Sequence, residues 1–157
     1  MGVATGVFIV GGIFGPVPFT WLAYGLWAAA IPSAVQLWRR YRRDAAVPAA
    51  GGVVWRILAL ALPLLFLVTA MKASQWDEFS QWLPNAQYIF RYDGFPGGGM
   101  PAISSAYSAY PYGLPLITYL ASKMAGAFIE NGGALANLFL LLLFAPLYLS
   151  LVRRRRA

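Results

Sequence analysis

The chain has 157 residues, of which 60% are hydrophobic and 11% charged, with a mean hydropathy of +0.62. Soluble domains are about 45–50% apolar and 25% charged, so this composition predicts a protein whose solvent is the lipid bilayer. The absence of cysteine and histidine excludes disulfides, Cys/His metal sites and His-based catalytic triads. Eight of the twelve basic residues lie in two clusters, 39–43 and 153–156, each after an apolar run, which indicates juxtamembrane anchoring rather than nucleic-acid binding.

Residues 1–52 are expected to form one or two membrane helices and a cytoplasmic linker. Residues 2–38 carry no charge, and as a single helix they would extend roughly 55 Å, beyond the ~30 Å hydrocarbon core. The sequence at 15–18, Gly-Pro-Val-Pro, interrupts this stretch, because proline lacks an amide donor and restricts its predecessor. We expect a span at 17–37 and leave open whether residues 1–38 hold one span or two. No basic n-region precedes the first apolar run, which argues against a cleavable signal peptide.

Residues 53–157 are expected to form a second unit with two spans, 53–71 and 133–152, a loop at 72–132 and a basic tail. A helix over 53–71 would be about 28 Å long, which matches a bilayer. On the side of the arginine clusters, nine basic residues oppose one acid, whereas the loop side has three basic and four acidic residues. The positive-inside rule therefore predicts that the loop 72–132 is extracytoplasmic.

Within the loop, residues 115–130 allow two interpretations. The segment is short for a span and contains Lys123, and its apolar residues recur at every fourth position, which favours a helix lying flat in the membrane interface. Only the flat arrangement places both arginine clusters in the cytoplasm. A second short helix is expected from Pro84 to residue 92. The predicted fold class is an all-α membrane protein with three or four transmembrane helices and an extracytoplasmic loop carrying two interfacial helices. The apolar positions of the 115–130 segment are Leu116, Leu120, Met124 and Phe128.

Asp77 and Glu78 are the candidate catalytic residues. The chain has five acidic residues, and these two adjoin directly after the predicted span 53–71. Apolar surroundings raise the pKa of a carboxylate and make it a better base near neutral pH. A solvated helix end is the alternative interpretation of the pair. The flanking apolar residues are Trp76, Phe79, Trp82 and Leu83.

Four residues of the loop are candidate substrate-binding groups. An arginine can hold a phosphate through paired charge-assisted hydrogen bonds. A tyrosine ring can pack on the apolar face of a sugar or on a prenyl chain while its hydroxyl donates a hydrogen bond. Interfacial belt tyrosines and an ordinary surface arginine are the alternative interpretations. No resident metal site is expected. The four candidates are Arg91, Tyr107, Tyr110 and Tyr112.

Four features follow one another in the chain: an acidic pair after Trp76, a short helix, a Gly/Pro loop, and the run from Tyr110 to Leu116, which reads Tyr-Pro-Tyr-Gly-Leu-Pro-Leu. This order resembles the first extracytoplasmic loop of the GT-C integral membrane glycosyltransferases, which include protein O-mannosyltransferases and aminoarabinose and arabinofuranosyl transferases. The resemblance covers about residues 53–152. It implies a polyprenyl-phosphate sugar donor and makes Asp77 the general base that deprotonates the acceptor hydroxyl. It makes Glu78 a residue that orients the acceptor or assists a divalent cation, where one is used.

Members of this family carry many more spans, so the resemblance makes this chain an N-terminal portion of such an enzyme, either a truncated reading frame or a split subunit. The expected partners are the lipid bilayer, a polyprenyl-phosphate sugar and the remaining part of the enzyme as a separate chain, with no nucleic acid. The expected location is the bacterial inner (plasma) membrane. A non-catalytic helical membrane scaffold or subunit is the alternative function. A transporter ranks third, because Arg56 is the one ionisable residue within the predicted spans.

Overall fold

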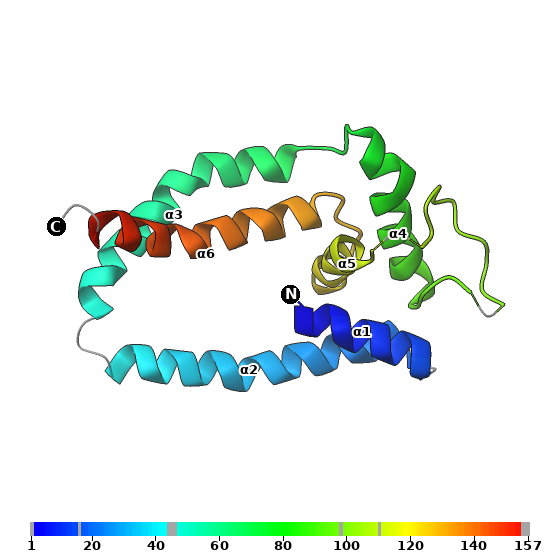
Figure 1. The fold of residues 1–157 in the computed structure, drawn as a ribbon, viewed down its shortest axis with the longest axis horizontal. Helices are drawn as coiled ribbons and strands as arrows, with labels where there is room; N and C mark the ends of the chain where they lie inside the picture. The colour runs from blue at the N-terminus through cyan, green and yellow to red at the C-terminus, as the bar shows by residue number, and fades with distance from the viewer. Residues whose placement is uncertain (1, 16, 44–46, 98, 110, 155–157) are drawn as a thin grey trace. The chain divides into compact units, whose positions relative to one another are not determined.

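The computed structural model describes residues 2–15, 17–43, 47–97, 99–109 and 111–154, apart from the side chains of residues 2, 41, 47–54 and 146–154. Within these ranges the chain forms helices and no strand. The elements are α1 (Gly2–Phe14), α2 (Phe19–Arg43), α3 (Val47–Ala70), the π-helical turn η1 (Glu78–Trp82), α4 (Leu83–Tyr92), α5 (Gly113–Ala125) and α6 (Gly132–Arg154) (Figure 1).

The chain divides into two compact units. Unit 1 consists of Met1–Ile31 and Lys72–Gly133, and unit 2 of Pro32–Met71 and Ala134–Ala157. Unit 1 therefore combines the beginning of the chain with the predicted loop, and it holds all the candidate site residues that the structure describes. Unit 2 contains the C-terminal part of α2, together with α3 and nearly all of α6.

The structure contradicts the predicted transmembrane helices. In the described part of the chain, no helix has both the length and the apolar character that crossing a bilayer requires. α1, α4 and α5 have 13, 10 and 13 residues, which is about 20 Å or less against a ~30 Å core. α2 has 25 residues but contains Pro32 and ends in an arginine cluster.

Two predictions are therefore wrong. One is the fold class of an all-α membrane protein with three or four spans, at 17–37, 53–71 and 133–152. The other is the location in the bacterial inner membrane. The extracytoplasmic assignment of residues 72–132 depended on the same spans and is wrong with them. Part of the physical reason lies in unit 1, where apolar residues near the N-terminus fill a protein core. Phe8, Phe19 and Ala23 are all buried there by other side chains of the chain itself.

The core of unit 1 is an aromatic cluster that joins segments far apart in the sequence. The ring of Phe8 meets Phe19 edge-on at 5.0 Å and Tyr119 at 5.8 Å between centroids, and Phe19 meets Phe95 at 4.8 Å. Edge-to-face pairs of this kind contribute about 0.5–1.5 kcal/mol each beyond the burial of their surface. They hold α1 and the start of α2 against α5 and the segment that follows α4. Ile89 and Leu116 complete the buried set.

The two helices of the loop, α4 and α5, pack against each other in unit 1 (Figure 1). α4 has Pro84 in its first turn; because the helical run already begins at residue 76, the proline leaves a carbonyl of the preceding turn without a helical amide, and the Ser80 carbonyl accepts from the amide of Ala106. α5 ends at Gly126, whose φ of 71° forms a left-handed cap that favours glycine. The apolar positions expected to form one stripe do not share one environment, because Leu116 is 1% exposed and Met124 is 73% exposed. The side that is buried consists of Pro115, Leu116, Thr118, Tyr119 and Ser122.

Replacing Phe8 with alanine tests the aromatic core. We expect the free energy of unfolding to fall by about 3–5 kcal/mol, because the lost ring leaves a cavity between α1 and α5. Ile13 on the same helix is 65% exposed, and Ile13→Ala is expected to change stability by less than about 0.5 kcal/mol. Urea denaturation followed by circular dichroism measures both variants. Equal losses would show that Phe8 is not a core residue.

Candidate functional site

A continuous helical run from residue 76 to residue 92 carries both candidate catalytic residues and Arg91. Its first residues are α-helical, η1 follows, and α4 completes the run. A π-helical turn contains extra backbone relative to an α-helix and frequently occurs at functional sites. The candidate catalytic pair therefore lies at a backbone irregularity of the kind found at functional sites.

Glu78 stabilises the start of this helical run. Its Oε2 accepts hydrogen bonds from the backbone amides of Ser74 at 2.7 Å and Gln75 at 2.9 Å. Amides at the beginning of a helix have no partner within the helix, and a nearby negative charge also complements the helix dipole. The carboxylate of Glu78 is thus engaged in a helix cap, a role that the sequence prediction of catalysis did not include.

Asp77 has a different environment from its neighbour. Its side chain is exposed, and it forms no hydrogen bond or ion pair with the other described residues. Trp76 beside it is 67% exposed and packs edge-on against Tyr107, with centroids 6.4 Å apart and planes at 75°. The predicted apolar enclosure of this carboxylate is therefore wrong. What the fold provides is an open carboxylate beside two exposed aromatic rings.

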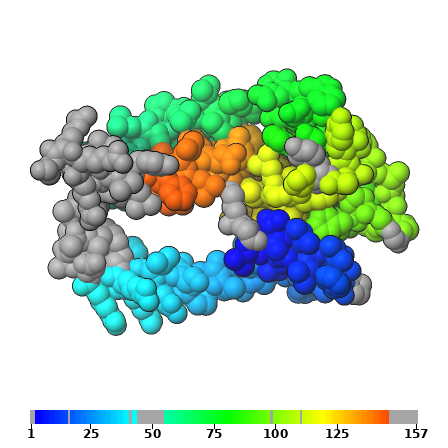
Figure 2. Space-filling view, viewed as in Figure 1, coloured from blue at the N-terminus to red at the C-terminus, as the bar shows by residue number. Residues whose placement is uncertain are grey.

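Hydrogen bonds hold the segment at 101–107 against the helical run. Figure 2 shows the surface that α4 and the residues after it form, in green and yellow. The hydroxyl of Tyr88 donates to the carbonyl of Pro101 at 2.8 Å, and the amide of Ala106 donates to the carbonyl of Ser80 at 2.8 Å. The side-chain amide of Asn85 donates to the carbonyl of Tyr107 at 3.4 Å. These contacts explain why Tyr107 lies next to Trp76, thirty-one positions earlier in the sequence.

Tyr112 packs against the core of unit 1 rather than beside Asp77. The hydroxyl of Tyr112 donates to the carbonyl of Ser108 at 2.7 Å, and its ring packs on Phe95 at 4.7 Å between centroids. Burial raises the pKa of Tyr112, and the neighbouring Tyr88 adds to this effect. Tyr112 thus supports the core of unit 1, against which it packs. Tyr110 lies outside the described residues.

Arg91 lines a pocket of about 630 Å³ formed by α4, residues 102 and 104, and Phe128. Neither Asp77 nor Glu78 lines this pocket. Fourteen residues separate Asp77 from Arg91 along the helical run, which corresponds to roughly 20 Å. A sugar carbon under attack is bonded directly to its phosphate oxygen, so both residues cannot act on one donor phosphate. The structure therefore separates two groups that the sequence had placed in one substrate site.

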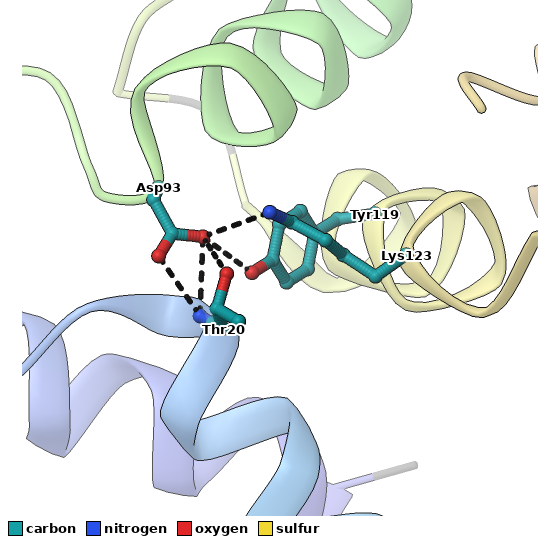
Figure 3. Close-up of polar contacts among 4 residues, drawn as sticks. All are labelled: Thr20, Asp93, Tyr119 and Lys123. Atoms are coloured by element: carbon teal, nitrogen blue, oxygen red, sulfur yellow. Dashed lines mark hydrogen bonds and ion pairs between the residues drawn. The ribbon is translucent and has the colours of Figure 1, made fainter. Parts of the chain in front are cut away.

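The most connected side chain of unit 1 is Asp93, which the sequence analysis did not single out. Its carboxylate accepts hydrogen bonds from the Thr20 hydroxyl at 2.7 Å, the Thr20 amide at 3.1 Å and the Tyr119 hydroxyl at 2.7 Å (Figure 3). Lys123 forms an ion pair with the same carboxylate at 3.4 Å. The backbone carbonyl of Asp93 also accepts from the amide of Phe19 at 3.0 Å. Asp93 thus caps the first turn of α2 from a position 73 residues away.

A sequence signal for this cap does exist. The residues before α2 are Val17 and Pro18, so the helix has no Ser, Thr, Asp or Asn immediately before it to accept its first amides. Water or a cap from elsewhere in the chain then has to satisfy these amides, and Asp93 follows directly after α4 with a left-handed φ of 58°. Aspartate tolerates this backbone conformation better than most residues. Which helix it would cap could not be read from the sequence.

The electrostatics of this cluster indicate a structural role. Burial alone raises the pKa of Asp93, but the hydrogen bonds from Tyr119 and Thr20, with the charge of Lys123, outweigh burial and lower it below its ordinary value. Burial and the hydrogen bond to Asp93 raise the pKa of Tyr119. The carboxylate is therefore ionised and the phenol protonated at neutral pH. A carboxylate surrounded by donors and a phenol that holds its proton are poor proton acceptors.

Asp93→Asn tests this cluster, because asparagine keeps the left-handed backbone accessible while it removes the charge. At pH 7 we expect the free energy of unfolding to fall by about 2 kcal/mol, the scale of a hydrogen bond to a charged group. The folded-state pKa of Asp93 is lowered, so its contribution is complete above the unfolded pKa of about 4 and is lost as the pH falls through the folded value. The difference between wild type and variant should therefore shrink in acid.

Urea denaturation at several pH values between 2 and 7 measures this difference. Glu130→Gln is the matched control, because Glu130 is exposed and lies in the same unit. A constant difference between wild type and Asp93→Asn over the whole range would show that ionisation of Asp93 does not stabilise the fold.

Among the described residues, no group of three or more Asp, Glu, His or Cys side chains could hold a metal ion. Comparisons of the chain with protein-family models, with curated proteins and with solved structures found no match. The resemblance to the GT-C glycosyltransferases therefore rests on the residues 76–78 and 110–116 and on their order in the chain. A function has to be argued from the side chains themselves.

Proposed function

We propose that this chain is part of a glycosyltransferase that moves a sugar from a polyprenyl-phosphate donor to an acceptor hydroxyl, with Asp77 as general base. The observation that carries the proposal is the open carboxylate of Asp77 beside the exposed ring pair of Trp76 and Tyr107. Exposed aromatic rings next to a carboxylate suit a sugar, because apolar ring faces pack on the aromatics while hydroxyl groups bond to the carboxylate. The resemblance in sequence supports the same reaction.

In the proposed reaction, the acceptor hydroxyl donates its hydrogen bond to the carboxylate of Asp77. The hydroxyl oxygen attacks the anomeric carbon of the donor and its proton passes to Asp77. The bond between the anomeric carbon and the phosphate oxygen breaks, and polyprenyl phosphate leaves with the electron pair. Glu78 contributes indirectly, because its cap on Ser74 and Gln75 fixes the helical turn from which Asp77 projects.

The proposed active site needs further walls. Asp77, Trp76 and Tyr107 are all exposed, whereas sites that enclose a small molecule bury most of its surface. We therefore propose that the remaining part of the enzyme is a separate partner chain that covers this side of unit 1. Binding of this partner would also exclude water from the carboxylate, which strengthens its interactions with the acceptor.

A non-catalytic helical subunit is the second candidate function. The observation that favours it is the set of large apolar side chains that are exposed within unit 2. Exposed apolar surface of this extent is typical of an interaction site. The residues concerned include Leu60, Phe66, Leu141 and Leu143.

Asp77→Asn distinguishes the two functions. We expect transfer from a radiolabelled polyprenyl-phosphate sugar to fall at least 100-fold, the usual contribution of a general base. The unfolding free energy should stay unchanged, because the Asp77 side chain makes no hydrogen bond or ion pair with the described residues. Extracts of producing cells are used for the assay, so that a separate partner chain is present, and vector-only extracts give the background.

Two further variants separate catalysis from helix capping. Glu78→Gln should lower the free energy of unfolding by about 1 kcal/mol through the weakened cap, with a smaller loss of transfer than Asp77→Asn causes. Glu130→Gln, an exposed acid elsewhere in unit 1, should leave both quantities unchanged. Transfer above background that persists in Asp77→Asn would remove the base assignment and favour the subunit.

A further inference from the structure

The pocket that contains Arg91 is a second feature of unit 1, separate from Asp77. Part of its helical wall is one face of α4, formed by Pro84, Gln87, Tyr88 and Arg91, each of which lies three or four positions from two of the others. Its volume of about 630 Å³ lies within the range of small-molecule sites. Residues 102 and 104 and Phe128 close the other sides.

The charge of this pocket is positive. Arg91 is its only ionised lining residue, and it makes no ion pair with any residue that the structure describes. Lys123 lies 5.5 Å from the ring of the lining residue Phe90, but its charge is balanced by Asp93 at 3.4 Å. No described acidic side chain lines the pocket. An anionic group would therefore be attracted to Arg91 without competition from a carboxylate of the protein.

The donors around Arg91 favour phosphate as the anion. A guanidinium can bond to two oxygens of one anion at once, and the pocket adds the side-chain amide of Gln87 and the hydroxyl of Ser104. The side chains of Gln87 and Ser104 are both exposed to solvent. Arg91, Gln87 and Ser104 together can present about five hydrogens to one anion, against about four acceptor sites on a carboxylate, whereas the three terminal oxygens of a phosphate monoester can accept all of them. The surplus of donors thus matches a phosphate better than a carboxylate.

Aromatic rings supply the rest of the lining. Phe90 and Phe128 lie 5.9 Å apart between centroids, and Tyr88 and Tyr92 lie 4.7 Å apart. The hydroxyl of Tyr88 is already bonded to the carbonyl of Pro101, so this residue offers the ligand its ring rather than a donor. Rings of this kind gain stability by removing apolar surface of a ligand from water.

We propose that this pocket binds a phosphate monoester with an apolar organic group, the phosphate on Arg91 and the organic group against Phe90 and Phe128. The site does not depend on the proposed function, because Arg91 lies roughly 20 Å along the helix from Asp77. The phosphate on Arg91 is therefore not the one that leaves the sugar in the proposed transfer. The organic group is either a flat ring or a branched hydrocarbon chain, since both fit an aromatic lining.

Isothermal titration calorimetry on the full chain tests the proposal with four probes: phenyl phosphate, geranyl phosphate, inorganic phosphate and phenol. We expect at least one of the two esters to bind at least tenfold more tightly than inorganic phosphate or phenol. Binding of phenyl phosphate identifies a flat ring as the organic group, and tighter binding of geranyl phosphate identifies a hydrocarbon chain. Inorganic phosphate that binds as tightly as both esters would overturn the proposal, as would the absence of binding by either ester.

Variants assign the binding to this pocket. Arg91→Gln should weaken ester binding at least tenfold, and Arg91→Lys should restore part of it, because lysine keeps the charge without the paired donors. Phe128→Ala should weaken binding of the esters but not of inorganic phosphate. Ser104→Ala removes the hydroxyl donor of the pocket at an exposed position, and it should weaken ester binding as well. Lys72→Gln removes a cation of unit 1 that lies outside the pocket, and this variant should bind as wild type. Ester binding unchanged by Arg91→Gln would refute the proposed site.

Discussion

The carboxylate of Asp93 is the interaction on which the rest of unit 1 depends. It accepts hydrogen bonds from Thr20 and Tyr119 and forms an ion pair with Lys123, so it joins the start of α2 to α5 at the point where α4 ends. A half-buried carboxylate is stable in such a place only because these donors offset its loss of hydration. The aromatic rings of Phe8, Phe19 and Tyr119 pack beside this polar cluster. Charge and apolar packing therefore fix the same helix junction.

This junction determines what the helical run from 76 to 92 can present. One side of α4 packs on α5, and its end is fixed by Asp93. The outer side then carries the Arg91 pocket, while the opposite end of the run carries Asp77 beside Trp76 and Tyr107. The two ends differ in chemistry as well as in place, since one offers a carboxylate and the other a guanidinium. A rigid run keeps them apart, which is why one substrate phosphate cannot serve both.

The error in the predicted membrane fold has an identifiable cause. Hydropathy counts apolar residues but does not say what will cover them, and Phe8, Phe19 and Ala23 are covered by the chain itself. The hydrophobic periodicity of 115–130 failed for a related reason. Thr118, Tyr119 and Ser122 are buried because their polar atoms find partners, Ser122 with the carbonyl of Thr118 and the amide of Ile129, and Tyr119 with Asp93. A pattern based on apolar residues alone cannot identify such positions.

By itself the sequence determined local features. It placed helices at 84–92 and 115–130, which the structure has at 83–92 and 113–125. It also gave the break at 15–18, of which residue 16 lies outside the described ranges, and the adjacency of Asp77 and Glu78. These follow from proline and glycine chemistry and from neighbours in the chain, which need no tertiary contact. Only the tertiary structure decided that Tyr107 returns to Trp76 and that Asp93 caps α2. The first is a contact between two rings and the second a contact between a carboxylate and a backbone amide, and in both the partners are far apart in the sequence. The order of residues along the chain leaves their partners undetermined.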